Sequence, residues 1–183
     1  LRSLKRTHAA AVGVIAAHEA SLPQPSASPE ALPITQDRVI PQTWTDYNGH
    51  MNEAHYLELG AAATDRFMEM IGADAAYIAE GLSYFTTENH SQYLYEMHAG
   101  DSVRVSTQVL EAGPKKMHLF HRMMNPAGEV AATMETFLLH VDLGTRRSAP
   151  ARADVAEALA AFGQAHAGMP RPEGAGRYVG QRG

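Results

Sequence analysis

A single long amphipathic segment, followed by several strand-like segments, most limits how this chain can fold. Apolar side chains recur at three- and four-residue intervals between residues 53 and 70, which predicts one helix with one apolar face. Gly72 is a typical residue at the end of such a helix. The apolar face needs a surface to cover it, and an antiparallel sheet is the surface that the following segments can build. The apolar positions are Tyr56, Leu59, Ala63, Phe67 and Met70.

Segments that alternate apolar and polar residues, rich in Val, Thr and Tyr, predict the strands of this sheet. One precedes the helix and four follow it, and Gly-containing turns separate the last four. Turns that join consecutive strands in this way indicate an antiparallel meander, so the expected fold class is α+β. The expected strands are residues 39–44, 84–96, 102–110, 117–124 and 130–143.

The ends of the chain differ in composition from its middle. A short helix followed by a Pro- and Ser-rich linker is expected at the N-terminus, either as a disordered arm or as the end of an upstream domain. The chain begins with Leu1 rather than Met, so a fragment and a processed form both stay open. A second short helix, near residues 155–162, is expected to lead into a flexible Gly/Pro/Arg tail. The three expected regions are residues 1–32, 33–150 and 151–183.

Composition argues against several classes of function. The formal net charge of −5 disfavours nucleic-acid binding, which usually requires a basic balance. The absence of cysteine excludes disulfides, thiolate catalysis and cysteine metal sites, and is compatible with a reducing cytoplasm. No apolar run approaches the roughly 18 residues needed to cross a membrane. A cytoplasmic protein with neither nucleic-acid nor membrane partners is therefore expected.

The densest cluster of polar residues lies between the first expected strand and the long helix. The string Asp46-Tyr47-Asn48-Gly49-His50-Met51-Asn52-Glu53 combines a carboxylate, a glycine, a histidine and two asparagines. Asn52 is placed to cap the helix that follows. An ordinary turn with a helix cap would use the same residue types, so a structural and a functional role both stay open at this point.

The order of elements, together with Asp46-x-x-Gly49-His50-x-Asn52-x-x-x-Tyr56, resembles the hotdog-fold acyl-CoA thioesterases of the 4-hydroxybenzoyl-CoA thioesterase-like branch. The resemblance covers residues 34–150. It implies a long helix wrapped by an antiparallel sheet, pairing into a homodimer or a dimer of dimers, and an acyl-CoA substrate with no further cofactor. Within the branch, the motif is most similar to betainyl-CoA thioesterases of carnitine degradation. Those enzymes can be fused behind L-carnitine dehydrogenase, whose C-terminal helix is similar in character to residues 1–22.

The resemblance also implies roles for the motif residues. Asp46 corresponds to the catalytic carboxylate, acting as nucleophile or as general base. The backbone amide near Glu53 corresponds to the group that polarises the thioester carbonyl. Gly49 is expected to allow close approach of the backbone, because it has no Cβ. His50 and Asn52 are expected to hold the loop and Asp46 in place.

Other chemistries fit less well but stay open. Some hotdog thioesterases use a carboxylate on the helix, yet Glu58 and Asp65 lie on a charged stripe that is typical of a solvated face. In the motif that hotdog hydratases resemble, a His follows an Asp by five residues, whereas His50 follows Asp46 by four. A thioesterase for aromatic or short-chain acyl groups, and a non-catalytic acyl-CoA-binding or dimerisation module, remain alternatives.

A cationic acyl group would need aromatic faces and a carboxylate around it. Aromatic residues near the expected strands, and Glu88 and Glu96, can supply both, although most of them would serve equally well as ordinary sheet residues. Basic pairs beside two turns could contact coenzyme A, or could simply be solvated. The candidate substrate-binding residues are Trp44, Tyr47, Tyr56, Asn89, His90 and Tyr93, and the candidate coenzyme A contacts are Lys115, Lys116, Arg146 and Arg147.

The spacing of the histidines predicts no metal site. His118 and His121 lie three residues apart on an expected strand, so they should point to opposite faces of the sheet. His50 and His55 are badly spaced for a single helix face.

Overall fold

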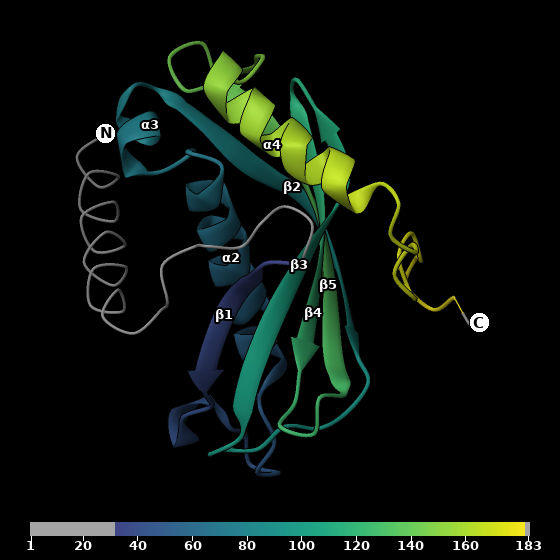
Figure 1. Ribbon diagram of the computed structural model, residues 1–183. Helices are drawn as coiled ribbons and strands as arrows, with labels where there is room; N and C mark the ends of the chain where they lie inside the picture. Colours follow the sequence, from purple (N-terminus) through teal and green to yellow (C-terminus); the bar gives the residue numbers. More distant parts are fainter. Residues whose placement is uncertain (1–31, 182–183) are drawn as a thin grey trace, which may run out of the picture.

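In the computed structural model, which describes residues 32–181, a curled antiparallel sheet wraps around one long helix (Figure 1). The helix expected near residues 4–22 and the linker after it lie outside the described residues. The elements are β1 (Ile34–Val39), the 3-10 turn η2 (Gln42–Trp44), α2 (Glu53–Met70), α3 (Ala75–Ala79), β2 (Leu82–Tyr93), β3 (Ser102–Gly113), β4 (Lys116–Met124), β5 (Val130–Asp142), β6 (Arg147–Ser148) and α4 (Ala153–His166).

The strand order is β1-β3-β4-β5-β2, with the short β6 paired to β5. Strands β3, β4 and β5 form the expected meander, but the predicted place of β2 in it is wrong. Strand β2 pairs with β5, with Leu82 opposite Asp142 and Tyr93 opposite Ala132. The chain between β2 and β3 is therefore a crossover from one edge of the sheet to the far side. Alternating strands separated by turn residues look alike in sequence whether the connection is a hairpin or a crossover.

The first strand and the C-terminal helix differ from their expected bounds. Strand β1 ends at Val39, where a strand was expected to begin, and the chain then forms η2 after Pro41. Pro41 has no backbone N–H to donate to β3, and its φ of −78° suits the residue before a helical turn. Helix α4 is longer than residues 155–162, and the short helix α3, capped by Asp74, was not expected.

Helix α2 begins and ends as the sequence predicts. The Asn52 side chain accepts a hydrogen bond from the Ala54 N–H at 3.0 Å, and Gly72 after the helix has φ +83°. Most of the predicted apolar face is covered, because Leu59, Ala63 and Phe67 are each 0% exposed and Tyr56 is 5% exposed, whereas Met70 is partly buried. Burial of this stripe supplies most of the free energy that holds the helix against the sheet.

Two core clusters follow one another along α2. The first half of the helix packs against residues of β3, β4 and β5, including Val105 and Met134. The second half packs against α4, which lies across one end of the sheet (Figure 1), and the rings of Phe67 and Phe162 meet edge to face at 5.1 Å. Helix α4 thus completes the core where the sheet alone does not cover α2.

The segment after α4 lies against the face of the sheet that points away from α2. Gln108 donates to the Pro170 carbonyl at 3.3 Å, Gln92 to the Gly174 carbonyl at 3.4 Å, and the Gly176 N–H donates to Glu135 at 2.6 Å. The expectation of a flexible tail rested on its Gly and Pro content. The structure places side chains from three strands within hydrogen-bonding distance of this backbone, and the flexibility of the tail stays a prediction.

A buried histidine links α2 to two strands. Thr64 and Thr107 hydrogen-bond to the two ring nitrogens of His121 at 3.0 and 2.9 Å, and burial lowers the pKa of His121 to about 3. In the unfolded chain the same ring has a pKa of about 6.5. Protonation therefore favours the unfolded chain below pH 6.5, and the free energy of unfolding falls as the pH drops towards 3.

We expect this histidine to cost about 2 kcal/mol of stability between pH 7 and pH 5. His121→Gln keeps hydrogen-bonding groups at the site but does not titrate. Denaturant unfolding of both proteins at the two pH values should show a smaller pH-dependent loss in the variant. Equal losses would contradict a neutral buried imidazole.

Candidate active site

The loop between η2 and α2 is closed by its own carboxylate. Asp46 Oδ1 accepts hydrogen bonds from the N–H groups of Asn48 at 2.8 Å and His50 at 3.3 Å. Two backbone hydrogen bonds, Gly49 N–H to Asp46 O and Asp46 N–H to His50 O, tighten the turn. Oδ2 of Asp46 makes no hydrogen bond within residues 32–181. One carboxylate oxygen thus holds the loop and the other stays available.

Gly49 is required by its backbone conformation. Its φ is +82°, a region that residues with a Cβ adopt at a cost. A Cβ placed there would meet no atom within 4 Å, so the protein itself does not crowd this position. The expectation that Gly49 provides clearance is not supported by its contacts within the chain.

The first turn of α2 offers an N–H group without an acceptor. Asn52 satisfies two of the first backbone donors, because its side chain accepts from Ala54 and its carbonyl accepts from His55. The N–H of Glu53 has no acceptor in the described part of the chain. Such a group carries part of the positive end of the helix dipole, and it lies on the same short loop as Asp46.

His50 and Asn52 support the loop differently from what the sequence predicts. His50 contacts Asp46 through its backbone N–H, whereas its imidazole Nε2 lies 3.2 Å from Glu96 Oε2. The Asn52 carboxamide caps α2 by accepting from Ala54, whereas the Asp46 carboxylate accepts from Asn48 and His50. Both residues therefore shape the loop, the first through its backbone and the second through the helix cap.

The crossover between β2 and β3 lies along this loop. The N–H of Met51 donates to the Met97 carbonyl at 2.7 Å, and His50 and His98 form an isolated antiparallel bridge. Residues 94–98 thereby become neighbours of the motif, a proximity that a simple meander would not provide. Sequence reasoning missed it because it depends on where β2 pairs.

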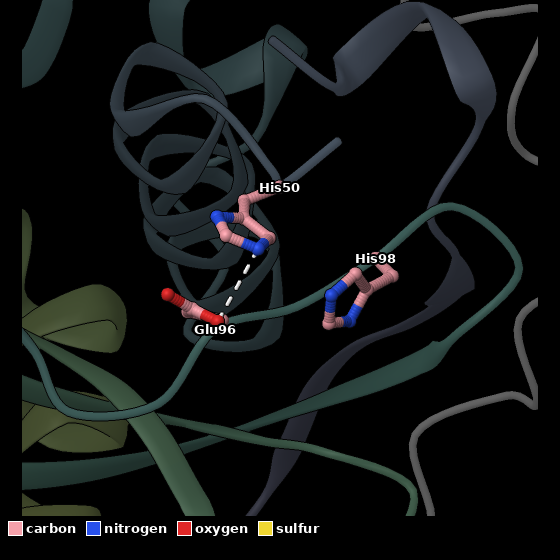
Figure 2. A group of neighbouring side chains, drawn as sticks. All are labelled: His50, Glu96 and His98. Carbon is pink, nitrogen blue, oxygen red and sulfur yellow. Dashed lines mark ion pairs between the residues drawn. The ribbon is translucent and has the colours of Figure 1, made fainter. Parts of the chain in front are cut away.

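Three side chains meet at this junction, namely His50, Glu96 and His98 (Figure 2). One potential ligand atom from each lies within 4.8 Å of the others. Asp101 lies behind His98, with Oδ2 at 3.7 Å from Nδ1. Two imidazoles and a carboxylate form a donor set that suits a transition-metal ion such as Zn²⁺.

The histidine pairs considered from the sequence do not come together. His118 lies 2.7 Å from Glu135 on the outer face, whereas His121 is buried towards α2. His55 pairs with Glu58 on the helix surface at 2.9 Å. The prediction of no metal rested on these pairs and did not consider the cluster of His50, Glu96 and His98.

A depression of about 210 Å³ lies beside the start of α2. Of the candidate substrate-binding residues, it includes Tyr56 and Tyr93, whose rings meet edge to face at 5.2 Å. Burial is the main cause of the raised pKa of both phenols, which therefore stay neutral at ordinary pH. The lining residues are His50, Met51, Glu53, Tyr56, Tyr93, Leu94, Tyr95 and Glu96.

The other candidate substrate-binding residues lie elsewhere. Trp44 stacks on His55 with ring centroids 4.9 Å apart, and Arg38 lies over the same ring system at 5.6 Å. Tyr47 is 97% exposed and does not line the depression. Asn89 and His90 lie on β2, opposite Thr136 and Glu135 of β5, and they do not line it either.

The basic candidates for coenzyme A contact lie at the opposite end of the sheet. Strand β3 starts beside the motif, where Ile40 N–H donates to Asp101 O, and runs for 12 residues to Gly113. At about 3.3 Å per residue, this places Lys115 and Lys116 some 35 Å away along the strand. Arg146 and Arg147 follow the end of β5. That end of β5 pairs with the start of β4, where Lys116 lies. Within one chain, these four residues therefore lie far from Asp46.

No helix within residues 32–181 is both long and apolar enough to span a membrane.

Comparison with known proteins gives a consistent picture. Residues 40–159 match the model of the thioesterase-like superfamily. The chain is 48% identical over 190 residues to a Ruegeria pomeroyi protein named L-carnitine dehydrogenase/betainyl-CoA thioesterase, covering 98% of this chain but only 38% of that protein. A Pseudomonas aeruginosa protein named betainyl-CoA thioesterase is 40% identical over 153 residues, which make up 82% of this chain and 96% of that protein.

Solved structures confirm the expected hotdog fold. A putative thioesterase from Pseudomonas putida superimposes with a TM-score of 0.71 at 33% identity, over 84% of this chain and 99% of its own. A Staphylococcus aureus protein solved in complex with CoA superimposes with a TM-score of 0.77 at 23% identity, over 82% and 97% of the two chains. The matching element order, the superfamily match and the identity to both sequence relatives lead to one assignment: this chain belongs to the thioesterase-like superfamily.

Proposed function

We propose that the chain hydrolyses an acyl-CoA thioester, and that its substrate is betainyl-CoA. The observation that carries the proposal is the loop before α2, which holds a carboxylate, Asp46, and leads within seven residues to a helix N–H without an acceptor in the described part of the chain. The names of relatives that are 40–48% identical support the choice of acyl group. The same names suggest that such a unit can work joined to an L-carnitine dehydrogenase.

Hydrolysis needs a nucleophile at the thioester carbon and a group that stabilises the oxygen as it gains charge. In the general-base form, Asp46 takes a proton from water while the water oxygen attacks the carbonyl carbon. The N–H of Glu53 donates to the developing oxyanion. The carbon–sulfur bond then breaks, and the thiolate of coenzyme A receives a proton, leaving betaine and free coenzyme A. In the nucleophilic form, Asp46 attacks the carbonyl carbon and the carbon–sulfur bond breaks, so that the thiolate of coenzyme A leaves and receives a proton. Water then cleaves the resulting anhydride, which releases betaine and restores the Asp46 carboxylate.

A second chain is expected to take part in the working enzyme. Strand β2 is an edge strand, and its residues 85–89 are exposed on both of its faces. A long edge with free backbone groups is a template for pairing with another strand. Pairing of two β2 strands would make a homodimer, and two such dimers could assemble further. Coenzyme A contacts from Lys115, Lys116, Arg146 or Arg147 would then have to come from a neighbouring chain.

A panel of thioesters tests the substrate proposal. We expect release of coenzyme A from betainyl-CoA with a higher kcat/KM than from acetyl-CoA or 4-hydroxybenzoyl-CoA. Detection of the free thiol with a chromogenic reagent measures all three reactions in the same way. Faster hydrolysis of the aromatic or the acetyl thioester would transfer the assignment to the corresponding alternative.

A further inference from the structure

The depression beside α2 has a composition that suits a cationic group with no hydrogen-bond donors. Three tyrosines contribute to its lining, and two of them, Tyr93 and Tyr95, keep 51% and 55% of their surface exposed. Tyr56 is only 5% exposed, and its ring meets the Tyr93 ring edge to face at an inclination of 68°, so it supports the more exposed Tyr93 ring at the wall of the depression. The face of an aromatic ring attracts a cation placed over it. Because a quaternary ammonium group has no N–H to donate, aromatic faces suit it better than hydrogen-bond acceptors do.

The permanently charged side chains around the depression are all acidic. Its lining, all within the described part of the chain, contains the carboxylates of Glu53 and Glu96 and neither Lys nor Arg. The side chain of Glu96 is 69% exposed, and among residues 32–181 its one ion pair is with the imidazole of His50, which also lines the depression. Negative charge near the ring faces strengthens their attraction for a cation and disfavours an anionic acyl group.

The position of the depression relates it to the reaction. Glu53, whose N–H would face the thioester oxygen, is also one of the lining residues. An acyl group attached to a carbonyl at that N–H can therefore extend into the depression. The trimethylammonium group of betaine is separated from its carbonyl by a single methylene, so a short reach is sufficient.

We infer that Tyr56, Tyr93, Tyr95 and Glu96 form the subsite for the quaternary ammonium group of the substrate, with Glu96 as the residue that selects for positive charge. The inference rests on the proposed thioesterase function and adds the residues that determine acyl specificity. Tyr95 and Glu96 belong to the crossover beyond β2, where the alternation of the strand has ended. Four consecutive residues can therefore line one depression.

Two substrates of equal shape isolate the role of charge. In 3,3-dimethylbutyryl-CoA a carbon atom replaces the nitrogen of betainyl-CoA, and the acyl group is otherwise the same. We expect Glu96→Gln to lower kcat/KM for betainyl-CoA about tenfold more than for the neutral thioester. We expect Tyr93→Leu to reduce the preference for the cation severalfold and Tyr93→Phe, which keeps the ring, to retain it.

Glu157→Gln, on the exposed surface of α4, is the matched control and should leave the ratio of the two kcat/KM values unchanged. An equal effect of Glu96→Gln on both thioesters, or no effect on either, would overturn the inference. It would also be overturned if EDTA removed activity towards both thioesters and Zn²⁺ restored it in the wild type but not in Glu96→Gln. That result would assign Glu96 to a metal held with His50 and His98.

Binding of the free acids separates this inference from the proposed function. We expect glycine betaine, but not 3,3-dimethylbutyrate, to give saturable shifts of tyrosine ring signals in NMR titrations, and Glu96→Gln to weaken them. This result would support the subsite even if no thioester were cleaved. Equal binding of the two acids, or no binding of glycine betaine, would refute the subsite even if betainyl-CoA were a substrate.

Discussion

Replacing Asp46 with Asn is expected to lower kcat for thioester hydrolysis by a factor of about 10²–10⁴, the usual contribution of a general acid or base. The substitution is matched to the geometry of the loop. The amide oxygen of Asn can still accept from the N–H groups of Asn48 and His50, as Oδ1 of Asp46 does at 2.8 and 3.3 Å. The loop should keep its shape, while the group that takes a proton or attacks the carbonyl is lost.

A second aspartate provides the control. Asp74 caps α3 with one carboxylate oxygen, which accepts from Ala76 and Tyr77 at 3.0 Å each, and it lies outside the motif. Asp74→Asn should leave kcat near the wild-type value and lower stability no more than Asp46→Asn does. Unchanged kcat in Asp46→Asn would show that this carboxylate only closes the turn, and would favour the non-catalytic module. Trapping an acyl group on Asp46 would decide between nucleophile and general base.

Phe67→Ala is expected to lower the free energy of unfolding by about 3–5 kcal/mol, the range for truncating a fully buried aromatic side chain. Phe67 is 0% exposed and joins α2 to α4 through its contact with Phe162. The cavity left by the ring would lie where the second core cluster begins. Denaturant unfolding monitored by circular dichroism measures the loss.

Leu57, on the same helix, is 46% exposed and is the matched control. Leu57→Ala should change the free energy of unfolding by less than about 1 kcal/mol, because nearly half of its surface stays in water after folding and its truncation leaves no enclosed cavity. If the two variants lost equal stability, α4 would not be held by the core contact that the structure describes.

The parts of the fold that depend on neighbouring residues could be predicted. The Asn52 cap, the apolar stripe from Tyr56 to Phe67 and the turn at Gly113 all follow from local chemistry, and the structure confirms them. The partner of β2 could not be predicted, because strand alternation contains no information on which strand lies beside it. The contact of the crossover with the motif could not be predicted for the same reason.

The candidate site likewise contains residues that could be predicted from local sequence and residues that could not. Asp46, Gly49 and Asn52 were found because they form one short string with an evident turn chemistry. Glu96 was considered as a carboxylate for a cationic acyl group, but neither it nor Tyr95 was among the candidate site residues, because they approach the motif only through the crossover. The basic pairs were selected for their place at turns, and the length of β3 separates them from the loop in a way that turn chemistry does not reveal.

The contact between the crossover and the loop has a consequence for how this chain could change during evolution. The backbone of Met97 holds the loop through Met51, while the side chains just before it face the proposed acyl subsite. Substitutions at Tyr93, Tyr95 or Glu96 can exchange one acyl preference for another and leave that backbone contact in place. Insertions or deletions between Leu94 and Met97 would shift subsite and loop together. Laboratory selection for new acyl groups should therefore yield point substitutions in this segment and very few changes in its length.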